Sequence, residues 1–106
     1  MNPHSEPLSV RYHRAHLKWC DLENAAAILE DTKSIVFSQM MLKHGSIAVN
    51  RAEIMVKASA EWQEHVEKIC AARYEANKAK AELEYLKMRG WEETSRAADN
   101  RLQARL

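Results

Sequence analysis

From residue 8 onward the chain holds only two residues of the kinds that usually end a helix, Gly45 and Gly90, and both prolines lie before that point. Glycine and proline are the residues that most often mark turns and the ends of strands, so this chain has few places to reverse. Ala, Glu, Lys, Arg, Leu and Met, which form helices well, dominate the remaining positions. The sequence therefore predicts an all-α fold of long helices.

The second half of the chain carries apolar residues at a seven-residue spacing. The row consists of Met55, Trp62, Ile69, Ala76 and Leu83. A second row, three residues further on, runs from Ala58 through His65, Ala72 and Ala79 to Leu86. Rows that alternate at spacings of three and four form the seam of a coiled coil, and a sustained seven-residue period predicts a left-handed supercoil.

The first half shows the same interlocking rows. Their members are Leu8, Tyr12, Ala15, Trp19, Leu22, Ala26, Leu29, Val36 and Met40, with Lys33 as the one polar position. The seam that we predict to join helices or subunits contains Trp19, Leu22, Leu29, Val36, Met55, Trp62, Ile69, Leu83 and Leu86. A further row of Ile28, Ile35 and Leu42 widens the apolar face, so we expect a third element or another chain to pack there.

Two short motifs predict where the first long helix ends and the second begins. In "KHGS", Lys43 and His44 suit the negative end of a helix and Gly45 suits the left-handed position after it. In "NRAE", Asn50 is the expected N-cap and Glu53 its capping-box partner, with Ser46 as a possible earlier cap. These motifs predict a helix over 8–43, a turn over 44–50 and an antiparallel helix over 51–89.

The stretch around Gly90 interrupts the seven-residue row. Gly90 takes the place of the next row member, and Trp91 follows one position late. We predict a kink or a stop at Gly90 and a C-terminal helix over 91–105; the alternative is an unbroken helix that tolerates the glycine. The whole is a flexible arm over 1–7 and a single domain over 8–106. That domain is a long antiparallel hairpin, coiled-coil-like, expected to dimerise into a helical bundle.

The charge balance, the apolar runs and the start of the sequence argue against several broad classes of partner. Sixteen basic and 15 acidic residues leave a net charge of +1, which gives no overall field to attract nucleic acid or an anionic membrane. No apolar run approaches the roughly 20 residues that span a bilayer, and the start shows no export signal. We therefore expect a cytoplasmic protein with free cysteines and no membrane partner.

No motif predicts catalysis or a cofactor. His13, His16 and Cys20 fall near one helix face, but a structural zinc site needs four ligands and no second ligand pair follows. A nucleophile would need a base and backbone donors, and the chain lacks a glycine-rich turn to supply them. We expect no enzymatic activity, no metal and no cofactor.

One cluster leaves nucleic acid open as an alternative. Arg11, Arg14 and Lys18 lie beside Tyr12 and Trp19, and aromatic rings next to cations can stack on bases. Both rings also belong to the predicted seam, which favours a protein partner over nucleic acid.

The C-terminal block "ANKAKAELEYLKMRGWEETSRAADNRLQARL" resembles the ends of small helical accessory proteins encoded by bacteriophages and prophages. The shared features are an Ala/Lys/Glu helix, "EYLKMR", a tryptophan, and a charged tail that ends in Arg and Leu. The resemblance implies a protein of the bacterial cytoplasm that docks on recombination, replication or host-defence machinery. It transfers no functional residue to this chain.

Three hypotheses follow from these observations. The first is a stoichiometric protein binder, for example an inhibitor of a host defence complex, whose contact residues are Ile28, Ile35, Leu42, Trp91 and Leu102. The second is an accessory factor in phage DNA recombination or replication that contacts nucleic acid. The third is a purely structural coiled-coil dimer.

Overall fold

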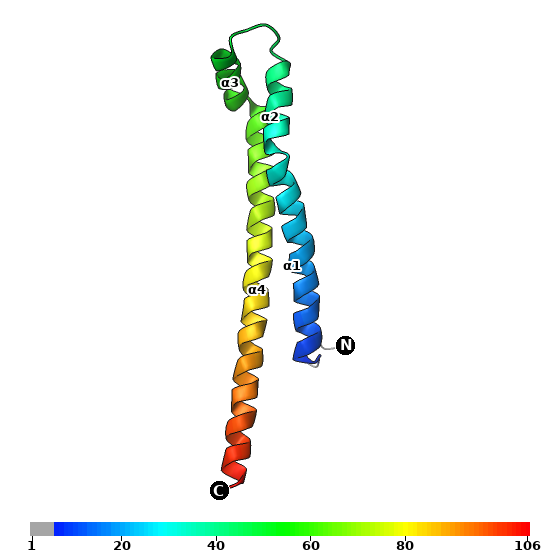
Figure 1. The fold of residues 1–106 in the computed structure, drawn as a ribbon, viewed down its shortest axis with the longest axis vertical. Coiled ribbons are helices and arrows are strands. Elements are labelled where there is room, and N and C mark those ends of the chain that lie inside the picture. The colour runs from blue at the N-terminus through cyan, green and yellow to red at the C-terminus, as the bar shows by residue number, and fades with distance from the viewer. Residues whose placement is uncertain (1–5) are drawn as a thin grey trace. The chain divides into compact units, whose positions relative to one another are not determined.

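The computed structural model describes residues 6–106, and in this range it contains four helices and no strand (Figure 1). The helices are α1 (Leu8–Asp31), α2 (Lys33–Leu42), α3 (Val49–Ala58) and α4 (Ala60–Ala104). The all-α prediction is confirmed. Residues 1–5 of the predicted arm lie outside the described residues, and α1 begins at Leu8 as expected.

Contacts divide the chain into two units, which we describe separately. Unit 1 comprises Met1–Asp21 and Asn77–Leu106, and unit 2 comprises Leu22–Ala76. Unit 1 thus holds the first part of α1 and the last part of α4, and unit 2 holds the remainder. The single domain over 8–106 stays a prediction. The contacts divide the chain into two units, although α1 and α4 each run through both of them.

The first predicted helix, over 8–43, is interrupted in unit 2 at Thr32. The Thr32 hydroxyl donates to the carbonyl oxygens of Ile28 and Leu29 at 3.0 and 3.2 Å. A hydroxyl that bonds back to the preceding turn in this way bends a helix. The Thr32 N–H still donates to the Ile28 carbonyl at 3.0 Å, so the backbone ladder continues across the bend.

The turn between α2 and α3 agrees with the prediction at Gly45 and differs from it at Asn50. Gly45 has φ +66°, which is the left-handed conformation that the "KHGS" motif predicts. The next helix begins at Val49 with Ala48 as its N-cap, and no side chain caps it. Asn50 therefore lies inside the first turn of α3, and its predicted role as N-cap is wrong.

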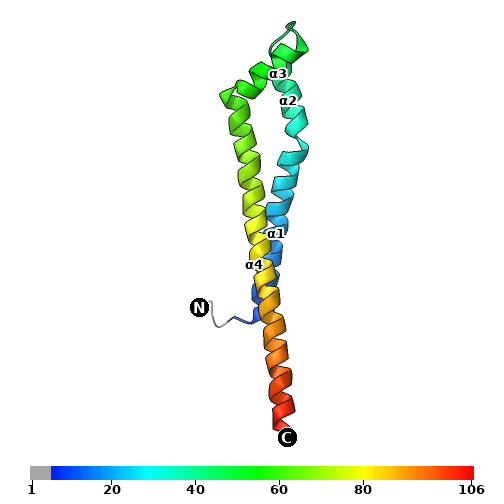
Figure 2. The same ribbon diagram turned by 90° about the vertical axis from the view of Figure 1, so that its left-hand side faces the viewer.

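The second predicted helix, over 51–89, is broken at Ser59, a break that the seven-residue rows do not predict. Ser59 is extended, with φ −73° and ψ 144°. Its Oγ accepts the Trp62 N–H at 3.2 Å and donates to the Val56 carbonyl at 2.6 Å, so one hydroxyl joins the end of α3 to the start of α4. Figure 2 shows the angle at which these two helices meet.

The predicted break at Gly90 is absent. Helix α4 runs from Ala60 to Ala104 without interruption, and Gly90 does not have a positive φ. A Cβ built on Gly90 would lie 3.5 Å from Leu8 Cδ2, an ordinary van der Waals distance. Gly90 therefore sits on the face of α4 that the start of α1 covers, in unit 1, and the row passes through it in phase.

Burial follows the seven-residue rows in both units. In unit 1, Ala79, Leu83 and Leu86 are buried and Trp19 is half-buried; in unit 2, Ala26, Trp62, Ile69 and Ala76 are buried, and Leu22, Leu29 and Val36 are half-buried. Met55, which is 44% exposed, and Ala58, which is also exposed, depart from this pattern. Helix α3 ends at the break at Ser59 and buries a different side from the one that the row predicts. Its buried residues are Ala52 and Val56.

Candidate protein-binding surfaces

The exposed apolar residues of α1 and α2 in unit 2 form the first candidate surface. Ile28, Ile35 and Leu42 are 54%, 56% and 80% exposed. Their seven-residue spacing places them along one side of the helical path, and we call this set the α2 face. Burying apolar surface is favourable by about 25 cal/mol per Å², so three aliphatic side chains left in water at a regular spacing indicate a surface suited to a partner.

Helix α3 adds two further aliphatic side chains at the same end of unit 2. Val49 and Ile54 are 66% and 69% exposed. Helices α2 and α3 are in contact and lie beside one another in Figure 1. Neither residue belongs to the apolar rows or to the contact residues predicted from the sequence.

A small core supports this end of unit 2. Met40, Val56 and Trp62 form a buried cluster, against which Val36 and Val66 also pack. The Phe37 and Trp62 rings meet edge to face with centroids 5.0 Å apart. A surface groove above these rings is bordered by Lys33, Lys57, Glu30 and Glu53. Because both charge signs border it, the groove selects neither an anion nor a cation.

One arginine ties α4 to α1 within unit 2. Arg73 donates to both carboxylate oxygens of Glu30, at 2.9 and 2.5 Å, and to Glu23 at 2.7 Å. A planar guanidinium fits a carboxylate in this bidentate way, which fixes the register of the two helices. The hydrogen bonds from Arg73 hold the pKa of Glu30 below its ordinary value.

The second candidate surface lies on α4 in unit 1, and we call it the α4 stripe. It consists of Met88, Trp91, Ser95, Ala98 and Leu102, spaced alternately by three and four residues. Met88, Trp91 and Leu102 are 60%, 68% and 61% exposed. The stripe lies on a different side of α4 from the row that contains Gly90, so the apparent skip at Trp91 marks a second face of one continuous helix.

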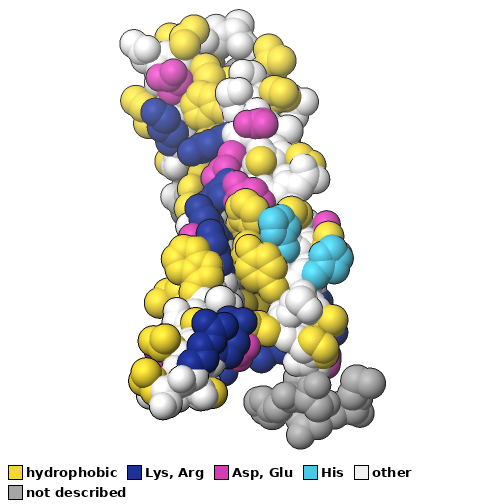
Figure 3. Space-filling view, turned by 60° about the horizontal axis from the view of Figure 1, so that its bottom comes forward, with side chains coloured by type: hydrophobic (Ala, Val, Ile, Leu, Met, Phe, Trp, Pro, Cys, Tyr) yellow, Lys and Arg dark blue, Asp and Glu magenta, His cyan; other side chains and the backbone are white. Residues whose placement is uncertain are grey.

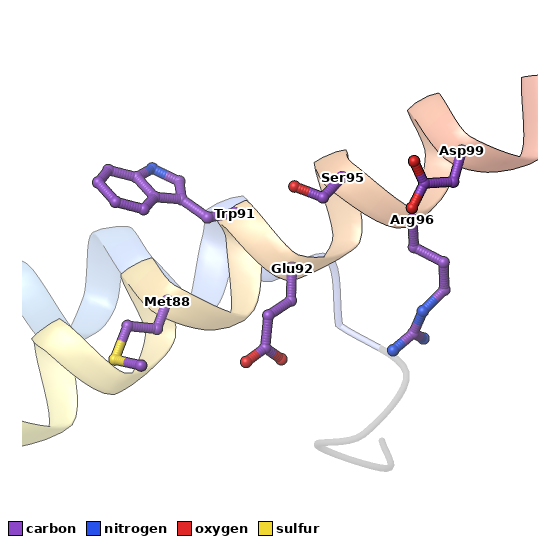
Figure 4. A pocket seen from close by; sticks show the side chains of 6 residues that line it. All are labelled: Met88, Trp91, Glu92, Ser95, Arg96 and Asp99. Carbon is purple, nitrogen blue, oxygen red and sulfur yellow. The ribbon is translucent and has the colours of Figure 1, made fainter. Parts of the chain in front are cut away.

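The α4 stripe borders a shallow hollow rather than a pocket. Figure 4 shows that the six side chains around this hollow, Met88, Trp91 and Ser95 among them, all come from α4. The Lys87 ammonium lies 5.5 Å from the centre of the Trp91 ring, a cation–π contact at the edge of the stripe. A surface built from one helix has no enclosed site for a small molecule, but it can lie against another helix.

The predicted nucleic-acid cluster is less available than the sequence suggests. Both terminal nitrogens of Arg14 donate to the Glu6 carboxylate, at 3.3 and 2.5 Å. Tyr12 and Trp19 are half-buried, and His16 meets each of them edge to face. Arg11 is half-buried and Lys18 is exposed. The cluster therefore offers few free cations, and the two rings predicted to stack on bases, Tyr12 and Trp19, are only partly accessible.

The face of the molecule in Figure 3 shows no broad patch of one charge, since Lys and Arg side chains there are interspersed with acidic and hydrophobic ones. Among residues 6–106, no group of three or more His, Cys, Asp or Glu side chains could hold a metal ion. Cys20 and Cys70 are exposed free thiols. Within the same range, no helix is long and apolar enough to cross a membrane.

Comparisons of the chain with models of protein families, with curated proteins and with solved structures return no match.

Proposed function

We propose that this protein is a non-enzymatic helical accessory protein that acts by stoichiometric binding to a larger protein assembly. The observation that carries the proposal is the α2 face, where Ile28, Ile35 and Leu42 stand 54–80% exposed above a packed core. Trp91 and Leu102 on the α4 stripe are the other proposed contact residues. Partly exposed aliphatic and aromatic anchors on a rigid support are typical of protein interfaces.

The biological setting of the proposal comes from the C-terminal resemblance. A phage-encoded protein of the bacterial cytoplasm would use such a surface to dock on a host or phage assembly, for example to block a defence complex. A long antiparallel, coiled-coil-like hairpin that dimerises is the architecture we propose for it. The pairing of Arg73 with Glu23 and Glu30, which links two chain segments of unit 2, supports the hairpin part of this proposal.

An accessory role in DNA recombination or replication with direct nucleic-acid contact is a weaker proposal. The ion pair of Arg14 with Glu6 and the partial burial of Tyr12 and Trp19 count against it. If it were correct, binding would fall steeply with added salt, because phosphate contacts release counterions.

The test is a tagged capture from bacterial lysate, with and without nuclease, using matched variants. We expect the wild-type chain to retain one protein at constant stoichiometry after nuclease, and Ile35→Asp or Leu42→Asp to lose it. Ala71→Asp, at an exposed position of α4 in unit 2, is the control and should retain it. Equal capture by all four chains would refute the α2 face as the binding surface, and loss of capture with nuclease would favour the nucleic-acid role.

A further inference from the structure

We propose that the α4 stripe binds the α4 stripe of a second copy of this chain, with the two helices parallel and in register. The inference rests on the proposed function in one respect: Trp91 and Leu102 are counted there as protein-binding residues, and here the bound protein is identified as a second copy.

The end of α4 packs against no other part of the described chain. Every residue from Trp91 to Leu106 is exposed. An isolated helix of about 12–15 residues is marginal in water, because its stability in proteins comes mainly from packing of an apolar face. A covering surface would therefore stabilise the final turns of α4, and the α4 stripe is the side on which their large apolar residues gather.

The α4 stripe has the residue pattern of a two-stranded coiled coil. Met88, Ser95 and Leu102 lie seven apart, and Trp91 and Ala98 follow the first two by three residues. These are the a and d positions of a two-stranded coiled coil, and the unbroken course of α4 through Gly90 keeps them in phase. In a parallel pair each residue meets its own counterpart. Ser95, the polar member, then faces another Ser95 and favours the in-register arrangement.

The charges beside the stripe are complementary to those of a second, parallel copy. Lys87 and Arg101 flank one side of the stripe, and Glu92 and Asp99 flank the other. In a parallel pair, a residue on the first side faces the residue five positions later on the second side of the other helix. Lys87 then meets Glu92 of the second copy, and the reciprocal pair forms by symmetry.

An antiparallel pair would bring together like charges instead. Lys87 would lie near Arg101 of the second copy, and Glu92 near its Asp99, because each flank then faces the same flank. Lys87 is already placed at the edge of the stripe by its contact with the Trp91 ring.

The parallel dimer has two α2 faces, one from each copy. It could therefore engage two target sites at once.

The first test measures self-association of the purified chain by sedimentation equilibrium. We expect the mean mass to rise toward twice that of one chain as the concentration increases. Lys87→Glu and Glu92→Lys should each weaken association by roughly tenfold, because two attractive pairs become repulsive, and the double variant should return to within about threefold of wild type. Glu82→Lys, at an exposed α4 position off the stripe, is the control.

The second test measures direction. In a chain whose Cys20 and Cys70 are replaced by serine, Leu102→Cys should form an intermolecular disulfide with oxidised glutathione, while Gln103→Cys, one position off the stripe, should not. A wild-type chain that stays monomeric at millimolar concentration, a double variant that is not rescued, or equal cross-linking at 102 and 103 would each overturn the inference. These results are separable from the proposed function, because capture through the α2 face is measured with Ile35→Asp and needs no dimer.

Discussion

The two glycines should respond in opposite directions to the same substitution. Gly45→Ala is expected to lower the free energy of unfolding by about 1–2 kcal/mol, because a side chain is strained at φ +66°. Gly90→Ala is expected to raise it by about 0.5–1 kcal/mol, since Gly90 lies inside a helix and a Cβ would meet Leu8 Cδ2 at an ordinary 3.5 Å. Urea denaturation of both variants checks this. A lower free energy of unfolding in Gly90→Ala would instead support the helix break that the sequence predicts at Gly90.

Glu30 provides a residue-scale test with a defined pH dependence. Its folded pKa lies below the unfolded value, so the stabilisation is complete above the ordinary glutamate pKa of about 4.3 and is lost as the pH falls through the folded value. The difference in melting temperature between wild type and Glu30→Gln should therefore be constant near neutral pH and shrink below about pH 4. Glu64→Gln, at an exposed position of α4, is the control. A difference that grows in acid would contradict the assignment.

At the scale of elements, Ser59 determines where α3 ends and α4 begins. Ser59→Ala should lower the free energy of unfolding by about 1 kcal/mol, because it removes the N-cap bond to the Trp62 N–H. Ser59→Asp keeps an acceptor at the N-cap and should recover most of the loss. Thr32→Ala is the comparison at the other break: Thr32 makes no capping bond, so the change should stay within about 0.5 kcal/mol. Thermal unfolding followed by circular dichroism measures all three.

The breaks at Ser59 and Gly90 show what a periodic pattern can and cannot predict. The row that runs through Met55 and Trp62 has the spacing of one continuous helix, so it gives no sign of the break at Ser59. Glu61, an acidic residue in the first turn of α4, is a helix-start signal that could have indicated this break. At Gly90 the pattern and the composition both indicated a break, but the helix continues, since a single glycine inside a helix costs only about 1 kcal/mol relative to alanine. Gly45 was predictable because its conformation depends on a local motif.

At the scale of the whole molecule, the sequence identified the exposed apolar row but not the ion pairs that join distant chain segments. Ile28, Ile35 and Leu42 could be named from spacing alone, because a third row exceeds what one helix can cover. The pairing of Arg73 with Glu23 and Glu30 joins residues 50 and 43 positions apart, a register that no local rule supplies. Val49 and Ile54 are also exposed, but they belong to none of the seven-residue rows identified from the sequence.

Replacing Trp91 distinguishes a role in self-association from a role in the stability of the chain. Trp91 is 68% exposed and contacts no other described element, so Trp91→Ala should leave the melting temperature of a dilute sample within about 2 °C of wild type. The same change should weaken self-association at least tenfold, because truncating a tryptophan that is buried in an interface typically costs 2 kcal/mol or more. Leu83→Ala, which truncates a buried side chain of the same helix, should show the reverse, with a large loss of stability of about 2–5 kcal/mol. If Trp91→Ala instead lowers stability and association together, Trp91 packs within the chain and the α4 stripe is not an interface.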